Sequence, residues 1–252
     1  MNKFLVCSFL SLLTFASLDK GLEIAKRMDA ASDGYVGETS SMRLILIDSS
    51  GKRIEREMEG SSIELKDMDR TIMNFVKPLD VKGTKLLTWA KHDDDDDQWL
   101  FLPSLKRVKR INSKTKGSSF MGSEFSFEDL GGQAIEKYTF DLKKEESFGN
   151  EKVWVLERVA KGKSSYSKVV IYVSKKHLTT MKSEYYNQRN ELVKIAVFSD
   201  FSDYKIGKKT IHRAGKIEMK NVQNNKQSIF LWENRKLGVK LSAGEFTKDS
   251  LR

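Results

Sequence analysis

The sequence predicts a mainly β protein built on a large antiparallel sheet or barrel of roughly eleven to thirteen strands. Segments in which apolar and polar side chains alternate recur along most of the chain after residue 35. Turn-forming residues such as Gly149 with Asn150, and Asn224 with Asn225, separate these segments. No linker rich in proline, or in glycine and serine, divides the 252 residues, so we expect a single domain over residues 18–252.

The N-terminal segment has a different pattern, which is typical of a signal peptide. Lys3 precedes an apolar run over residues 4–15, and the small residues Ala16 and Ser17 follow. The run is too short to span a membrane as a helix. We therefore expect residues 1–17 to be a signal peptide that is cleaved near residue 16 or 17, and the protein to be exported.

After this segment, residues 19–32 place apolar side chains at helical spacing, which predicts an amphipathic helix that ends at Asp33 and Gly34. Residues 40–57 then predict two strands joined by a turn at residues 48–51. Further strands are predicted within residues 70–80, 84–92, 151–160, 167–176, 179–188, 192–201, 215–222 and 227–235. Residues 118–133 interrupt the alternation and predict a loop with a short helical turn, which would cover a mouth or an edge of the sheet.

Motifs of enzyme active sites are absent from the sequence. His92, His177 and His212 are far apart and lack the spacing of metal ligands. There is no nucleophile elbow and no phosphate-binding glycine loop. The only cysteine, Cys7, lies in the predicted signal peptide. The sequence therefore predicts no enzymatic activity, no catalytic residues, no metal and no cofactor.

Five consecutive aspartates, at residues 93–97, lie between two strand-like segments. A calcium site is one interpretation, but the run lacks the alternating ligands and the glycine of a calcium loop. A solvated hairpin tip is the other, because repelling charges resist pairing between strand edges. We favour the hairpin tip.

Positive charge exceeds negative charge by 10. Nucleic-acid binding would use cations that follow a phosphate backbone. The candidates are Lys106, Arg107, Lys109, Arg110, Lys114 and Lys116. Export argues against this function, because an exported protein seldom meets nucleic acid, whereas phospholipid head groups also carry phosphate.

Residues 99–111, WLFLPSLKRVKRI, join apolar and basic side chains in one short stretch. In a strand, Trp99 and Phe101 face one side while Leu100 and Leu102 face the other, so both faces are apolar. One face either lines a hollow or belongs to a central strand that is covered twice. The basic half either holds an anionic group at the rim of the hollow or is simply solvated.

Residues 99–111 and 119–130 together resemble the signature of the outer-membrane lipoprotein-sorting protein family, distant relatives of the periplasmic carriers LolA and LolB. The matching residues are Trp99, Leu102, Pro103, Arg107, Val108, Arg110, Ile111, Phe120, Met121, Gly122, Phe125, Ser126, Glu128, Asp129 and Leu130. The C-terminal GEFTKDSL also resembles the family's closing segment.

This resemblance implies a half-open antiparallel β-barrel of about eleven strands with a helical lid, whose hollow holds acyl chains in the periplasm. The expected lipid-binding residues are Trp89, Trp99, Phe101, Leu102, Phe120, Met121 and Phe125. The expected head-group residues at the rim are Arg107, Lys109 and Arg110.

The expected ligands are acyl chains of lipoproteins or phospholipid-like lipids, with only peripheral contact to membranes. By the same resemblance, an RND-type exporter or an outer-membrane acceptor is an expected partner, and nucleic acid is not. The alternative function is that of a periplasmic β domain that carries no lipid and serves as a protein-binding subunit of such an exporter.

Overall fold

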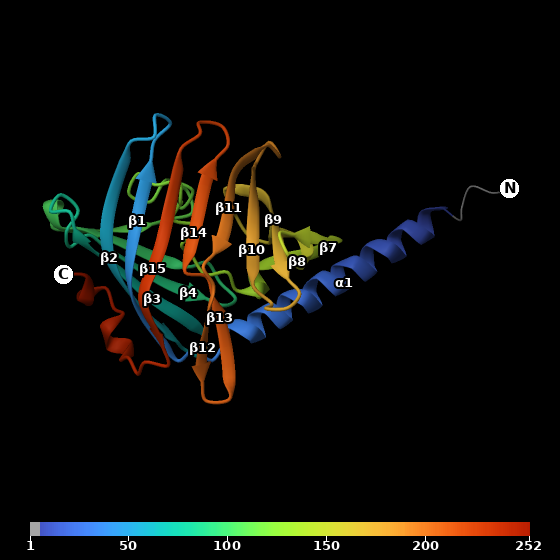
Figure 1. The fold of residues 1–252 in the computed structure, drawn as a ribbon, viewed down its shortest axis with the longest axis horizontal. Coiled ribbons are helices and arrows are strands. Elements are labelled where there is room, and N and C mark those ends of the chain that lie inside the picture. The colour runs from blue at the N-terminus through green and yellow to red at the C-terminus, as the bar shows by residue number, and fades with distance from the viewer. Residues whose placement is uncertain (1–5) are drawn as a thin grey trace.

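The computed structural model describes residues 6–252, with side chains from residue 17 onward. Figure 1 shows one long helix, α1 (Val6–Ser32), that leads into a large sheet. Most of the predicted signal peptide lies outside the described side chains, and its cleavage stays a prediction. The helix predicted over residues 19–32 is confirmed, and it ends at Ser32 as expected. Within the described residues, no helix combines the length and the apolar character needed to cross a membrane.

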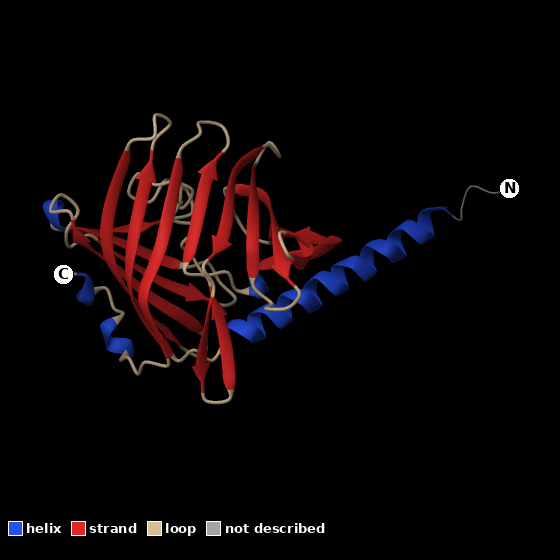
Figure 2. Cartoon of the chain, in the orientation of Figure 1, coloured by secondary structure: helices blue, strands red, loops and turns tan. Residues whose placement is uncertain are grey.

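Thirteen strands of the described chain form one antiparallel sheet (Figure 2). They are β1 (Gly37–Ile47), β2 (Arg53–Glu64), β3 (Met68–Lys77), β4 (Lys85–Lys91), β5 (Asp97–Leu102), β6 (Arg107–Ile111), β7 (Tyr138–Phe148), β8 (Glu151–Ala160), β9 (Tyr166–Ser174), β10 (Thr180–Asn187), β11 (Leu192–Ser199), β14 (Lys216–Asn221) and β15 (Gln227–Leu237). The strands β12 (Ser202–Ile206) and β13 (Lys209–Arg213) form a separate hairpin. Four short 3-10 turns lie at Pro103–Leu105, Ile135–Lys137, Ala243–Glu245 and Asp249–Leu251.

The predicted hairpin of residues 40–57 shows how local chemistry sets these strands. The side chain of Asp48 accepts hydrogen bonds from the backbone N–H groups of Ser50 and Lys52, at 2.9 and 3.0 Å. Gly51 has a φ of 88°, which a residue without a Cβ adopts readily. The turn therefore reverses the chain between Ile47 and Arg53, and β1 pairs with β2 along its full length.

The order of strands in the sheet is β6-β5-β4-β3-β2-β1-β15-β14-β11-β10-β9-β8-β7. The chain builds outward from β1 to β6, then crosses to the opposite edge through residues 112–137, which we call the crossing loop. From β7 it returns to the centre, where β15 pairs with β1. The edge strands β6 and β7 do not pair with each other, so the curved sheet stays open. The predicted mainly β, half-open fold is confirmed, and the described residues form fifteen strands instead of about eleven, with one α-helix.

Helix α1 packs against the β7 edge of this sheet. Ile24 and Ala25 are buried against Phe140 of β7 and Leu156 of β8. The helix approaches closely because Gly21 has no side chain: a Cβ there would lie 2.5 Å from the backbone oxygen of Phe140. The helix thus covers one of the two free edges, which an exposed sheet would otherwise present for pairing with another chain.

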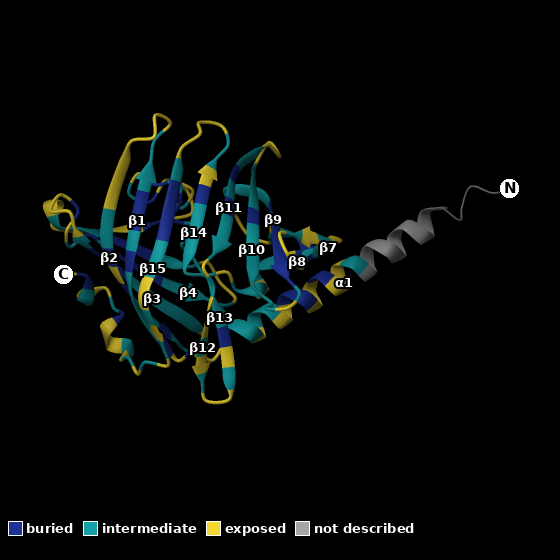
Figure 3. Cartoon of the chain, viewed as in Figure 1, coloured by how far each residue is buried: buried dark blue, intermediate teal, exposed yellow. Residues whose placement is uncertain are grey.

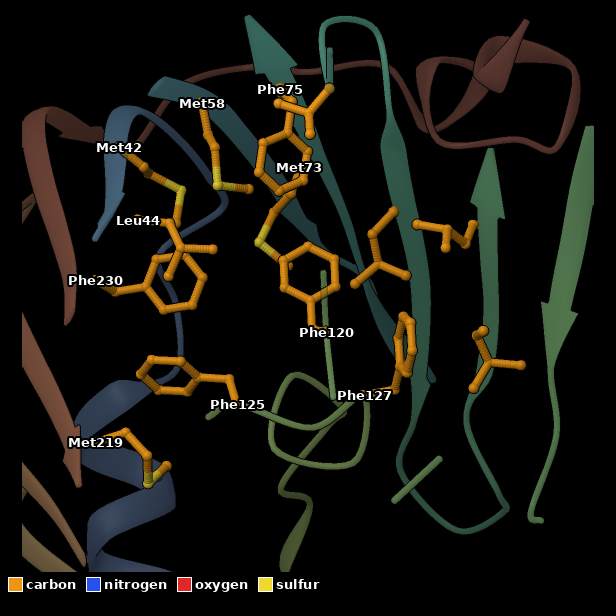
Figure 4. Close-up of a cluster of buried hydrophobic side chains, with 14 of the residues drawn as sticks. Met42, Leu44, Met58, Met73, Phe75, Phe120, Phe125, Phe127, Met219 and Phe230 are labelled. Carbon is orange, nitrogen blue, oxygen red and sulfur yellow. The ribbon is translucent and has the colours of Figure 1, made fainter. Parts of the chain in front are cut away.

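The main hydrophobic core lies on the concave face of the sheet, where the crossing loop meets the strands (Figure 4). The ring centroids of Phe120 and Phe75 are 5.7 Å apart, and those of Phe125 and Phe230 are 4.7 Å apart. These phenylalanines attach the loop to β15, the central strand of the sheet, and to β3, which lies three strands away towards the β6 edge. The loop therefore fills part of the concave side and leaves the rest open.

The C-terminal segment, residues 238–252, covers the convex face around β4 and β5. Phe246 and Leu251 are 1% and 0% exposed and pack with Trp99 and Leu87. The indole N–H of Trp89 donates a hydrogen bond of 2.8 Å to the backbone oxygen of Phe246. Figure 3 shows that buried residues follow the strands while exposed ones gather at the hairpin ends. Strands β4 and β5 are consequently covered on both faces.

Candidate functional site

A cavity of about 430 Å³ lies between the concave face of the sheet, α1 and the crossing loop. Its apolar wall combines aromatic rings with long, unbranched side chains. The wall includes Met28, Met42, Met73, Met219, Phe125 and Trp232. Gln133, which also lines the cavity, is exposed, so the cavity opens to solvent at that point. Methionine side chains adapt to ligands of irregular shape, so this wall suits a flexible apolar ligand.

One ion pair is buried beside this cavity. The ammonium of Lys194 lies 2.5 Å from a carboxylate oxygen of Asp129, and the two side chains are 9% and 3% exposed. The same carboxylate accepts a 2.9 Å hydrogen bond from the hydroxyl of Tyr166 and a 2.6 Å bond from the backbone N–H of Ser126. Burial and the Asp129 charge raise the pKa of Tyr166, which therefore stays neutral. The two charges neutralise each other, and the contacts of Asp129 with Tyr166 and Lys194 attach the crossing loop to β9 and β11.

Arg158 on β8 also lines the cavity. Its guanidinium carbon lies 4.4 Å from the ring centroid of Tyr138 on β7. Burial raises the pKa of the Tyr138 phenol, although the Arg158 charge opposes this effect. The contact between a guanidinium and a neutral aromatic ring stabilises the cation by less than the loss of its hydrating water costs.

Carboxylates gather where α1 ends. Burial raises the pKa of Asp69 to about 6, and the negative charge of Glu64 adds to the effect. Burial likewise raises the pKa of Asp29, which lines the cavity, with a further contribution from Asp33. Of these carboxylates only Asp29 lines the cavity, and the wall beside it disfavours additional negative charge.

Of the seven residues predicted to bind lipid, Phe125 lines the cavity. Phe120 is fully buried in the concave core, and Leu102 and Met121 pack against that core. These three residues lie on the concave side of the sheet but outside the lining of the cavity.

The other three residues lie on the convex face. Trp89 and Trp99 pack edge to face, with ring centroids 5.0 Å apart, and Phe101 joins the same cluster. The predicted alternation is present, because Leu100 and Leu102 face the concave core instead. The C-terminal segment covers the convex residues, so the strand is packed on both sides. Contact between these residues and a lipid stays a prediction.

The three predicted rim residues lie on the edge strand β6. Arg107, Lys109 and Arg110 are exposed, and none lines the cavity. The guanidinium of Arg110 forms an ion pair with Asp97. The structure therefore leaves the head-group role of these cations as a prediction and places them on the free edge of the sheet.

The acidic run is only partly a solvated hairpin tip. Residues 93–95 are exposed, as predicted. Asp96 instead is half-buried, pairs with Lys137 and accepts a 2.6 Å hydrogen bond from the backbone N–H of Gly132. Asp97 pairs with Lys91 at 3.0 Å. Two of the five aspartates therefore hold neighbouring segments in place. In the described part of the chain, no three His, Cys, Asp or Glu side chains gather where they could hold a metal ion.

Which polar residues line or border the cavity was not predicted from the sequence. For Arg158 a signal exists, because the alternation in EKVWVLERVA places it on the same face as Leu156. An arginine in phase with buried residues indicates a cation that faces inward. Asp129 belongs to the signature that resembles the family, but its pairing with Lys194 has no sequence signal, because the two are 65 residues apart and meet only through the fold.

Several comparisons with known proteins bear on this fold. A family model described as "Uncharacterized protein" matches residues 67–252. No curated protein matches the chain. The chain is similar to the crystal structure of an outer membrane lipoprotein-sorting protein domain from Vibrio parahaemolyticus. The two are 36% identical with a TM-score of 0.89, over 93% of this chain and 99% of the other.

A DUF1329 family protein from Desulfovibrio piger is 28% identical, with a TM-score of 0.87 over 94% of this chain and 99% of that one. A LolA superfamily protein from Nitrosomonas europaea is 20% identical, with a TM-score of 0.71 over 91% and 98% of the two chains. The last similarity shows a shared fold alone. The open sheet with its concave cavity is thus a LolA-like fold. The chain belongs to the outer membrane lipoprotein-sorting protein family, as the signature in residues 99–130 predicts.

Proposed function

We propose that this protein is a periplasmic carrier that binds the acyl chains of lipoproteins or related lipids in its concave cavity, without covalent chemistry. The observation that supports this function most directly is the apolar cavity of about 430 Å³ that opens beside α1. Its volume falls within the range of roughly 300–1,000 Å³ that is usual for small-molecule sites. The similarity to the Vibrio parahaemolyticus protein, which is described as an outer membrane lipoprotein-sorting protein domain, points the same way.

The need for such a carrier follows from the hydrophobic effect. Each methylene exposed to water costs about 0.8 kcal/mol, so a chain of about fifteen methylenes costs roughly 12 kcal/mol. A cavity that replaces this contact with water lowers the barrier to crossing an aqueous compartment. A wall of methionine and aromatic side chains provides the contact without requiring one fixed ligand shape.

A pair of substitutions on one strand tests the site. Ala160 lines the cavity, whereas its neighbour Val159 is exposed on the opposite face of β8. We expect Ala160→Trp to fill the cavity and to reduce binding of a fluorescent acyl probe at least tenfold. Val159→Trp adds the same ring outside the cavity and should leave the affinity within about twofold. Titration of the probe into each purified, folded variant measures both.

Equal affinity in both variants would contradict the cavity as the lipid site. Failure of the wild-type protein to bind any acyl probe would instead favour the alternative function, a protein-binding subunit of an exporter. Pull-down of the exporter's periplasmic domain would then be the informative measurement.

A further inference from the structure

Arg158 differs from the other arginines whose Nε atom is buried. Among the described residues, four arginines have a buried Nε without a hydrogen-bond partner. Three of them, Arg56, Arg70 and Arg235, donate hydrogen bonds from another guanidinium nitrogen to a backbone oxygen. The Nε of Arg235 also lies 2.9 Å from a carboxylate oxygen of Glu38, as an ion pair. In the described structure the side chain of Arg158 forms neither a hydrogen bond nor an ion pair, and its guanidinium lies against the ring of Tyr138, with the phenol of Tyr185 also within electrostatic range. A partly buried cation without an oxygen partner is costly, so this site calls for an acceptor.

Of the three carboxylates that line the same cavity, two are engaged elsewhere. Asp129 is paired with Lys194. Glu128 accepts hydrogen bonds from the hydroxyl of Ser164 and the backbone N–H of Ser165, at 2.5 and 2.8 Å. The third, Asp29, forms no ion pair with Arg158, and burial followed by the charges of Asp33 and Glu136 raises its pKa. No carboxylate of the described chain thus neutralises Arg158 within ion-pair distance.

We propose that Arg158 binds the oxyanion of an acyl-chain amphiphile, so that the preferred ligand is an anionic lipid rather than a neutral one. This inference rests on the proposed function, because it assigns the chemical class of the ligand in the same cavity. The guanidinium presents paired donors that fit a carboxylate or a phosphate, and the apolar wall of Met28, Phe125 and Met219 accepts the chain. The oxyanion and the acyl chain of one ligand are then both bound within the same cavity.

In this arrangement the head group is bound at the cavity wall and not at the edge strand β6. Arg107, Lys109 and Arg110 lie on β6, while Arg158 lies on β8, near the other edge of the sheet. Arg110 already has a carboxylate partner in Asp97. Arg158 is therefore better placed than the β6 cations to hold an anion whose chain occupies the cavity.

Displacement of a bound fluorescent acyl probe by three unlabelled lipids tests the proposal. The lipids are palmitate, with a carboxylate; lysophosphatidic acid, with a phosphate; and monopalmitin, which is neutral. We expect Arg158→Gln to weaken at least one of the two anionic lipids about tenfold, and to leave monopalmitin within about twofold. The anion that loses more identifies the source of the oxyanion. The double variant Arg107→Gln with Arg110→Gln should change none of the three affinities.

Unchanged monopalmitin binding in Arg158→Gln also shows that the cavity is still folded. Equal weakening of all three lipids, or no weakening of either anion, would overturn the assignment of Arg158. Loss of selectivity in the Arg107 and Arg110 variant alone would overturn it in favour of the edge strand. Failure of the wild-type protein to bind any of the three lipids would overturn the proposed function itself, together with this inference.

Discussion

Phe125 and Phe246 are both almost completely buried, at 3% and 1% exposure, yet they lie on opposite faces of the sheet. Phe125 lines the cavity, and Phe246 packs under the C-terminal segment against Trp99. Truncation of a ring in a filled core removes contacts on every side, whereas a ring at a cavity has fewer contacts to lose. Substitution of each residue therefore distinguishes the contribution of core packing from that of ligand binding.

We expect Phe246→Ala to lower the free energy of unfolding by about 3–5 kcal/mol and to leave acyl-probe affinity per folded molecule unchanged. Phe125→Ala should cost less stability and should weaken the probe, because it removes part of the cavity wall. Denaturant unfolding and probe titration on the same samples measure both quantities. A fall in probe affinity for Phe246→Ala alone would place the lipid site on the convex face.

Asp69 predicts a pH dependence of stability. Because burial raises its pKa to about 6, above the unfolded value of about 3.9, the folded state favours the protonated form. Its cost to stability is therefore absent below about pH 4, grows as pH rises and is complete above pH 6. Asp69→Asn should raise the melting temperature by a few degrees at pH 7 and leave it unchanged at pH 4. The exposed neighbour Asp67→Asn is the control, and an equal gain at both pH values would refute the explanation.

Arg158 shows how far the alternation of side chains along a strand predicts the site. Its phase along β8 indicates an inward-facing cation, which the alternation alone makes visible. The lack of an oxygen partner depends on β7, α1 and the crossing loop, which meet it only in three dimensions. For the same reason, the composition of residues 99–111 correctly predicts that both faces of β5 are apolar but not what covers the face of Trp99. The cover is a C-terminal segment without regular strand or helix pattern.

At the scale of elements, strands with a buried face were predictable and charged edge strands were not. The segments 151–160 and 227–235 alternate clearly and form β8 and β15. Strand β6 consists largely of cations, and β7 contains the charged run at residues 143–146, so neither shows an apolar face along its length. Charges there suit edges that must resist pairing with other chains. The hairpin of β12 and β13 lies outside the main sheet, and local alternation does not predict it.

The contact between α1 and β7 depends on Gly21. A side chain at this position would clash with the backbone of Phe140, so we expect Gly21→Val to displace the helix from the sheet edge. The melting temperature should fall, and release of a bound acyl probe should become faster because α1 forms one wall of the cavity. Glu23→Val makes a similar change at an exposed position of the same helix and serves as the control. Equal effects of both variants would show that helix propensity, rather than the close contact, causes the loss.

At the scale of the whole molecule, the open sheet leaves one concave side that must be covered. The crossing loop fills the part near β3, and α1 borders the part near β7. Sequence patterning predicts the mainly β fold and the helix. It does not predict how the two halves of the sheet meet, because the pairing of β1 with β15 joins residues nearly 200 positions apart, such as Leu44 and Phe230. The cavity is the space that the crossing loop and α1 leave unfilled on the concave side.

Native mass spectrometry of the protein purified from the periplasm tests the carrier function most directly. We predict a mature chain that begins near Leu18, accompanied by species with the added mass of an acyl lipid, identified by fragmentation. The lipid-bound species should disappear in Ala160→Trp and persist in Val159→Trp. A folded wild-type protein without any bound lipid, or equal lipid occupancy in both variants, would contradict the account.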